Sequence, residues 1–129
     1  MNGRYLLDTN IVIALFGQDL AITRRLGEAE EVFISSIVLG ELYYGARRSQ
    51  RAESNVAKID NFAAGMPVVA VEAQTAREYG RIKDHLRAKG KLIPENDIWL
   101  AGAAQAYSLT LVSRDDHFKE VQGLSLEKW

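Results

Sequence analysis

The chain has 129 residues and a formal net charge of -1, and 47% of its residues are hydrophobic and 26% charged. This length can bury a sizeable core and the composition is typical of a globular protein, so we expect one domain over residues 1–129. No cysteine is present, which excludes disulfides and thiolate metal sites. Because the charge is nearly balanced, a polyanionic partner would have to be held by local charge or by a metal ion.

Short apolar runs typical of strands alternate with longer helical patterns along the first part of the chain. Residues 4–8 predict a buried strand, followed by a helix that opens near Asn10, a residue type favoured as an N-cap. This apolar stretch is too short to span a bilayer and no small-residue cleavage site follows it. We therefore expect a cytoplasmic protein without a signal peptide or membrane anchor. A polar helix is predicted over residues 19–30 and a second strand over 32–35.

In the middle of the chain, Ser35 and Ser36 can cap a helix that covers "IVLGELYYGA". After "RRSQR", another helix is predicted to run to Ala64, where Gly65 can end it. Residues 67–71 predict a third strand. The helix predicted over residues 73–89 has an apolar face formed by Ala76, Tyr79, Ile82 and Leu86.

The last third of the chain begins with Pro94, which precedes an apolar and therefore buried helix over residues 95–107. Strands are predicted over 109–113 and within 124–128. Strands that alternate with helices predict an α/β fold, in which a central, mainly parallel sheet of four or five strands is covered by helices on both faces. Ligands of such sheets bind at the carboxyl ends of the strands, which points to Asp8 and to "SRDD" over residues 113–116.

Four acidic residues stand where a structural role is unusual: Asp8, Glu41, Asp97 and Asp115. Glu41 is the only charged residue between Ile37 and Ala46, and a carboxylate among apolar residues requires a partner. The other three have simpler explanations. Asp97 would favourably face a helix N-terminus, Asp115 could cap a short helix, and Asp8 could pair with Arg4 or Arg114.

If the four acids converge, their mutual repulsion must be offset. Two unit charges about 4 Å apart repel by roughly 4 kcal/mol at an effective dielectric constant near 20. Protons, basic side chains or a cation can offset this repulsion. The two histidines, His85 and His117, do not have a metal-ligand spacing such as H-E-x-x-H. A site made only of oxygen ligands favours Mg²⁺ or Mn²⁺.

The ordered motifs "LLDTNIVI", "ISSIVLGELYYGA", "IPENDIWLAGAAQA" and "LVSRDDHF" run through almost the whole chain. In these motifs the chain resembles the PIN-domain ribonucleases and, within them, the VapC toxins of bacterial toxin–antitoxin pairs. The resemblance implies a single three-layer PIN domain over residues 1–129. It maps the family's catalytic and metal-binding acids onto Asp8, Glu41, Asp97 and Asp115, and it leaves Asp116 as a solvated neighbour. Thr9 and Ser113 match small hydroxyl positions of the family, where they would support these acids, and turn capping explains the two residues equally well.

The resemblance also implies an activity and its partners. We expect a Mg²⁺- or Mn²⁺-dependent endoribonuclease that cleaves a phosphodiester by metal-activated water, acts as a homodimer and is inhibited by a VapB-like antitoxin. The stretch "YYGARRSQRAESNVAKIDNF" resembles VapC toxins that cut initiator transfer RNA, which indicates tRNA as the substrate. Candidate phosphate contacts lie in three basic clusters, at residues 47–51, 87–91 and 24–25. Candidates for base stacking are Tyr43, Tyr44 and Trp99.

Other functions fit the sequence less well. The alternative closest to the proposed nuclease is a non-catalytic PIN-like module that binds RNA or protein, which the presence of all four acids disfavours. A phosphatase of the haloacid-dehalogenase type needs a second acid two residues after its nucleophile, and Asn10 stands there. The chain also lacks a glycine-rich phosphate loop and the G-x-S-x-G motif of serine hydrolases.

Overall fold

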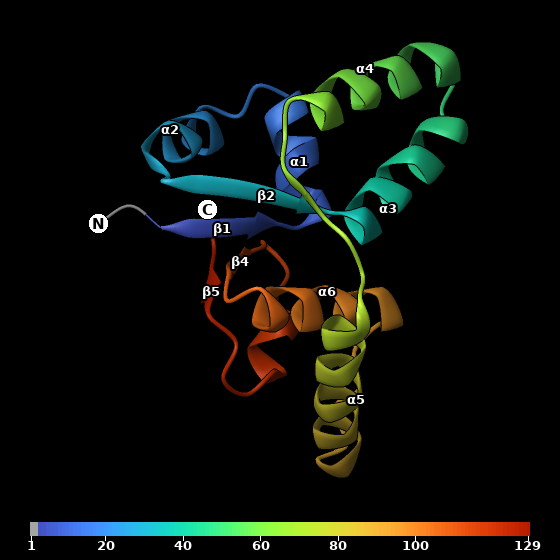
Figure 1. Cartoon of the computed structure of the whole chain (residues 1–129). Helices are drawn as coiled ribbons and strands as arrows, with labels where there is room; N and C mark the ends of the chain where they lie inside the picture. The colour runs from blue at the N-terminus through green and yellow to red at the C-terminus, as the bar shows by residue number, and fades with distance from the viewer. Residues whose placement is uncertain (1–2) are drawn as a thin grey trace.

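The computed structural model describes residues 3–129, which form a five-stranded sheet and its covering helices (Figure 1). The elements in chain order are β1 (Arg4–Leu7), α1 (Thr9–Phe16), α2 (Leu20–Glu28), β2 (Glu31–Ser35), α3 (Ser36–Arg47), α4 (Ala52–Ala64), β3 (Val68–Val69), α5 (Ala73–Ala88), α6 (Glu95–Ala106), β4 (Thr110–Val112), the short 3₁₀ helix η1 (Asp116–Glu120) and β5 (Leu126–Glu127). Within residues 3–129, no helix combines the length and apolar character needed to cross a membrane.

All five strands are parallel, in the order β3-β2-β1-β4-β5. β1 is the central strand, and its residues Leu6 and Leu7 are completely buried. Leu7 aligns with Ile34 of β2 and with Val112 of β4, so these three strands end side by side. The predicted parallel α/β sheet is therefore confirmed, with five strands.

The strand order creates a switch point between β1 and β4. From β1 the chain moves outward to β2 and β3, and it then returns across the sheet to β4 and β5. Because crossovers between parallel strands are right-handed, the outward and returning connections lie on opposite faces of the sheet. Figure 1 shows α1, α2 and α4 on one side of the strands and α5 and α6 on the other. Ligands of such sheets bind at the switch point, beyond the strand ends.

Several element boundaries differ from those predicted by one or two residues, and two of these differences have an evident cause. Helix α1 begins at Thr9, and its N-cap is Asp8, whose carboxylate accepts a hydrogen bond from the Thr9 N–H. The Asn10 side chain is instead directed toward the segment that follows β4, where its carbonyl oxygen accepts the Arg114 N–H at 3.3 Å. Strand β3 has only two residues, because its pairing is confined to the last two residues of β2.

Helix α6 is held tightly against α5. Ile98, Leu100 and Ala101 of α6 are buried, as the apolar pattern predicted. At Gly102, a Cβ atom would lie 3.2 Å from the Thr75 carbonyl oxygen of α5, so the absent side chain allows the two helices to approach closely. This packing fixes the position of the first turn of α6, which carries Asp97.

Candidate active site

The four predicted acids line one pocket at the switch point. The pocket has a volume of about 600 Å³. Its lining residues are Asp8, Thr9, Asn10, Ile13, Glu41, Pro94, Glu95, Asn96, Asp97, Asp115 and His117. The acids come from four different parts of the fold: the end of β1, the middle of α3, the first turn of α6 and the segment that follows β4. The structure thus brings together the residues that the sequence analysis singled out.

Asp8 is buried, with 6% of its surface exposed, and two donors fix its carboxylate. Oδ1 accepts the Thr9 N–H at 2.8 Å, and Oδ2 accepts the Ser113 hydroxyl at 2.7 Å. The salt bridge considered for Asp8 is absent, because Arg4 pairs with Glu31 and Arg114 pairs with Asp19. Among residues 3–129, no basic side chain pairs with Asp8. Its charge is therefore held by neutral donors alone.

Glu41 projects from α3 toward the N-terminus of α1. Its Oε1 accepts the Thr9 hydroxyl at 2.6 Å, and its Oε2 accepts the Asn96 side-chain amide at 3.4 Å. Thr9 therefore contacts two of the acids, through its N–H to Asp8 and through its hydroxyl to Glu41. No basic partner of Glu41 occurs in the described part of the chain. A neutral hydroxyl and amide orient this carboxylate without removing its charge.

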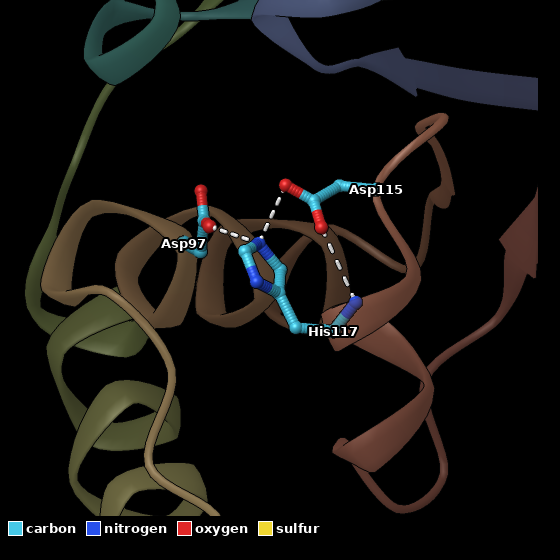
Figure 2. A group of neighbouring side chains, drawn as sticks. All are labelled: Asp97, Asp115 and His117. Atoms are coloured by element: carbon cyan, nitrogen blue, oxygen red, sulfur yellow. Dashed lines mark hydrogen bonds and ion pairs between the residues drawn. The ribbon is translucent and has the colours of Figure 1, made fainter.

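Asp97 and Asp115 face each other across the ring of His117 (Figure 2). His117 Nε2 lies 2.7 Å from Asp97 Oδ2 and 2.7 Å from Asp115 Oδ2. Asp115 Oδ1 also accepts the His117 backbone N–H at 3.3 Å, so Asp115 caps the short helix η1 as one of the alternatives predicted. The neighbouring Asp116 is exposed and pairs with Lys119 and Lys128, outside the pocket.

Two acids of the pocket, Asp8 and Asp97, have raised pKa values when no cation is bound. Burial raises the pKa of Asp8 above its ordinary value, and the charges of Glu41 and Asp115 add to this effect, while hydrogen bonds from Ser113 and Thr9 oppose it. Burial also raises the pKa of Asp97 to about 6, helped by the charge of Asp8 and opposed by His117. A divalent cation would reverse both effects, because it favours the ionised carboxylates.

His117 was missed as a candidate because its position in the sequence matches no metal-binding spacing. It comes from η1, whereas Asp97 comes from α6, so their proximity depends on the tertiary structure. Asp97, Asp115 and His117 each offer one ligand atom, and these atoms lie within 4.8 Å of one another. His117 Nε2 is shielded from solvent and makes no hydrogen bond of acceptable geometry in residues 3–129, despite its short distances to the acids. Carboxylate oxygens together with an imidazole nitrogen that makes no hydrogen bond form a donor set that fits a divalent cation.

The contacts and exposure of the three aromatic candidates show which of them is best placed to stack on a base of RNA. Tyr43 is engaged by a hydrogen bond to Asp60, and Trp99 stacks on Tyr79 with ring centroids 4.0 Å apart. Tyr44 is 65% exposed, and it lines a neighbouring hollow that shares Glu41 and Asn96 with the acidic pocket. Of the three aromatic candidates, Tyr44 is the most exposed, and the Arg48 guanidinium lies over its ring at 5.9 Å from the centroid.

The three basic clusters differ in how many of their side chains form ion pairs. Arg47, Arg48 and Arg51 lie at the exposed turn between α3 and α4 and form no ion pair within residues 3–129. Lys89, by contrast, pairs with Glu120, and Arg25 pairs with Glu127. The cluster over residues 47–51 is therefore the one with the most unpaired positive charge.

Comparison with known proteins identifies the family. The PIN domain family model matches residues 5–124. Ribonuclease VapC2 of Haemophilus influenzae is 40% identical over 129 residues, with 98% of each chain covered. The chain belongs to the PIN-domain family, as a VapC-type ribonuclease. A second VapC relative, the tRNA(fMet)-specific endonuclease VapC of Shigella flexneri, is 33% identical over 129 residues, again with 98% of each chain covered.

The VapC fold is equally evident from solved structures. The chain matches the crystal structure of VapBC2 from Rickettsia felis, bound to a DNA fragment from their promoter, with a TM-score of 0.91 and 34% identity. The match covers 98% of both chains. The resemblance to VapC toxins and the three-layer PIN-like fold are therefore confirmed, whereas the individual roles of the four acids stay predictions.

Proposed function

We propose that this VapC-type ribonuclease cleaves transfer RNA, with initiator tRNA as its preferred target, and uses Mg²⁺ or Mn²⁺ held by Asp8, Glu41, Asp97 and Asp115. The observation that carries the proposal is the convergence of these four acids at the switch point without a lysine or arginine among them. The mutual repulsion of four close carboxylates is tolerated where a cation offsets it. Because the relative from Shigella flexneri is a tRNA(fMet)-specific endonuclease, tRNA is the first substrate to test. Cleavage of tRNA also places the activity in the cytoplasm.

In the proposed mechanism, the cation and the side chains of the pocket have different roles. When bound, a divalent cation supplies Lewis-acid stabilisation of phosphate charge and makes water more acidic. Asp8 and Asp97 would hold it, with Asp8 fixed in orientation by the Thr9 N–H and the Ser113 hydroxyl. Asp115 and Glu41 would complete the acidic shell, directly or through water, and Glu41, oriented by the Thr9 hydroxyl, would orient the attacking water. Attack by water leaves a 5′-phosphate and a 3′-hydroxyl.

RNA would approach the acidic pocket along positively charged surface. The unpaired arginines of the α3–α4 turn, Arg47, Arg48 and Arg51, supply phosphate contacts that carry no sequence information. Tyr44, between this turn and Glu41 on the same helix, presents an exposed ring on which a base can stack. The charges thus attract the RNA backbone, and the pocket beyond them receives the phosphate to be cleaved.

A groove beside the acidic pocket suits the VapB-like antitoxin partner. The groove has a volume of about 360 Å³ and lies between α1, α3 and α4. Its apolar residues include Phe16 and Ile13, and Ile13 is 57% exposed. The groove shares Thr9, Ile13 and Glu41 with the acidic pocket. An antitoxin segment seated there could direct a basic side chain toward the acids and so exclude the metal.

The first prediction tests the catalytic role of two acids. Purified protein should cleave initiator tRNA with Mg²⁺ or Mn²⁺, and EDTA should stop the reaction. Asp8→Asn and Asp97→Asn should each lower the rate by at least about a hundredfold, because each variant loses a charge that positions the cation. Gel analysis and sequencing of the RNA ends give the rate and the cleavage site.

Asp116→Asn is the matched control for this experiment. It removes an acid that is close in sequence but exposed, and that pairs with Lys119 and Lys128 instead of facing the pocket. Its rate should stay within about twofold of wild type. Full activity in EDTA would contradict the metal mechanism. RNA that is bound but left uncut by wild type under all metal conditions would instead favour the non-catalytic PIN-like module.

A further inference from the structure

His117 occupies a position that the four-acid mechanism does not require. Its ring enters the acidic pocket from η1, and Nε2 lies 2.7 Å from an oxygen of each of two acids, Asp97 and Asp115 (Figure 2). The ring is also held in place. The His117 backbone N–H donates to Asp115, and the ring contacts Phe118, a fully buried residue, edge to face at 5.6 Å.

The bonding of Nε2 is incomplete in this position. The atom is hidden from solvent, yet its short distances to Asp97 and Asp115 are not accompanied by the angles of a hydrogen bond. Metal-bound imidazole presents a nitrogen lone pair to the ion, together with neighbouring oxygen ligands. Adjacent ligand atoms around an octahedral ion with bonds of about 2.1 Å are about 3 Å apart. Nε2 and the two carboxylate oxygens already have nearly this spacing.

We propose that His117 is a nitrogen ligand of the metal ion in this chain, and that it makes the site prefer Mn²⁺ to Mg²⁺. The inference rests on the metal-dependent function proposed above and specifies the ion. Mg²⁺ demands oxygen ligands and keeps most of its water, so it gains little from an imidazole. Affinity for nitrogen ligands rises from Mn²⁺ along the divalent transition metals. Asp97 and Asp115 supply the oxygen ligands on either side of Nε2.

The test is pulsed electron paramagnetic resonance of Mn²⁺ bound to protein without a histidine tag, in a buffer without nitrogen ligands. Wild type should show modulation from a directly bound ¹⁴N nucleus, and labelling with ¹⁵N-histidine should convert the signal to that of ¹⁵N. His117→Gln should lose the signal, with about tenfold or more weaker Mn²⁺ binding and less than about threefold change for Mg²⁺. His85→Gln, which removes the only other histidine, should retain the ¹⁴N signal.

The possible results separate the two proposals. Mn²⁺ that binds to wild type and is lost in Asp97→Asn, but shows no nitrogen modulation, overturns the role of His117 and leaves the metal-dependent nuclease standing. A nitrogen signal that persists in His117→Gln also overturns the role of His117. Wild type that binds neither ion contradicts both proposals. Because the wild-type spectrum alone shows whether nitrogen is bound, the test does not depend on how well the variant folds.

Discussion

Ser113 connects three parts of the acidic pocket through one hydroxyl group. Its oxygen donates to Asp8 at 2.7 Å and accepts the Asp115 N–H at 3.0 Å, and the Asn10 amide approaches it at 3.4 Å. The residue itself is 2% exposed. The hydroxyl therefore sets the separation between the acid at the end of β1 and the acid that follows β4. The relative positions of two acidic residues, Asp8 and Asp115, thus depend on the neutral residue Ser113 that lies between them.

The raised pKa of Asp97 gives a prediction about stability and pH. Without metal, folded Asp97 binds a proton up to a pH of about 6, whereas the unfolded residue has an ordinary value of 3.8. The folded state therefore binds more protons in this range, so wild type loses stability as the pH rises from about 4 to about 6. Asp97→Asn lacks this loss. Its free energy of unfolding relative to wild type should rise by about 1–2 kcal/mol over that range and stay constant above it.

Urea denaturation in EDTA at a series of pH values measures this difference. Asp116→Asn provides a control of opposite sign, because hydrogen bonds from Lys128 and Lys119 lower the pKa of Asp116. The stability that Asp116 contributes develops as the pH rises toward its ordinary pKa of 3.8 and is constant above that value, so Asp116→Asn should lose stability relative to wild type as the pH rises to about 4 and show no further change between about pH 4 and 6. If the Asp97→Asn difference does not change with pH, burial and the charge of Asp8 do not raise the pKa of Asp97.

Among the elements, those with a strong local signal were predictable. The apolar pattern of α6 and the Ser35 cap of α3 were both read correctly from the sequence, because neighbouring residues determine them. The cap of α1 was not, since Asp8 and Asn10 are both good capping residues and only the contact of Asn10 with the segment after β4 decides between them. His117 lies two residues after Asp115, but it meets Asp97 through tertiary packing, which no local pattern indicates.

Helix α3 gives a prediction about RNA binding. Tyr44 is exposed near the acidic pocket, and stacking of one base on an aromatic ring contributes about 1–3 kcal/mol. Tyr44→Ala should therefore raise the KM for tRNA by about fivefold or more and leave the affinity for metal unchanged. Tyr44→Phe keeps the ring and should behave like wild type. Steady-state cleavage kinetics measure both variants. Equal KM values for Tyr44→Ala and wild type would show that no base stacks there.

At the scale of the whole molecule, the pocket joins the two helical layers of the sheet. Glu41 belongs to the outward connection, Asp97 to the returning one, and Asp8 to the central strand. The packing of α6 on α5 at Gly102 holds Asp97 in place from outside the sheet. A cation bound to these acids would therefore link both faces of the fold. A homodimer remains a prediction from the resemblance to VapC toxins.

This arrangement predicts that metal stabilises the entire fold. An ion that binds only the folded state at a hundred times its Kd adds about 2.7 kcal/mol to the free energy of unfolding. Wild type should gain this amount with Mn²⁺, and Asp8→Asn should gain much less. Asp116→Asn, outside the pocket, should respond like wild type. Thermal melts with EDTA or Mn²⁺ measure the gain, and an equal response of Asp8→Asn would place the ion elsewhere.

The order of the strands also has a consequence for synthesis of the chain. β1 lies at the centre of the sheet and carries Asp8, but its neighbour β4 and the acid that follows it, Asp115, are made long after it. A chain that leaves the ribosome from its N-terminus can form β1, β2 and α3 early, yet it has no complete acidic pocket until the segment after β4 has emerged. A growing polypeptide therefore lacks part of the acidic pocket until most of its sequence has been translated. The topology delays toxicity until translation of that segment is over.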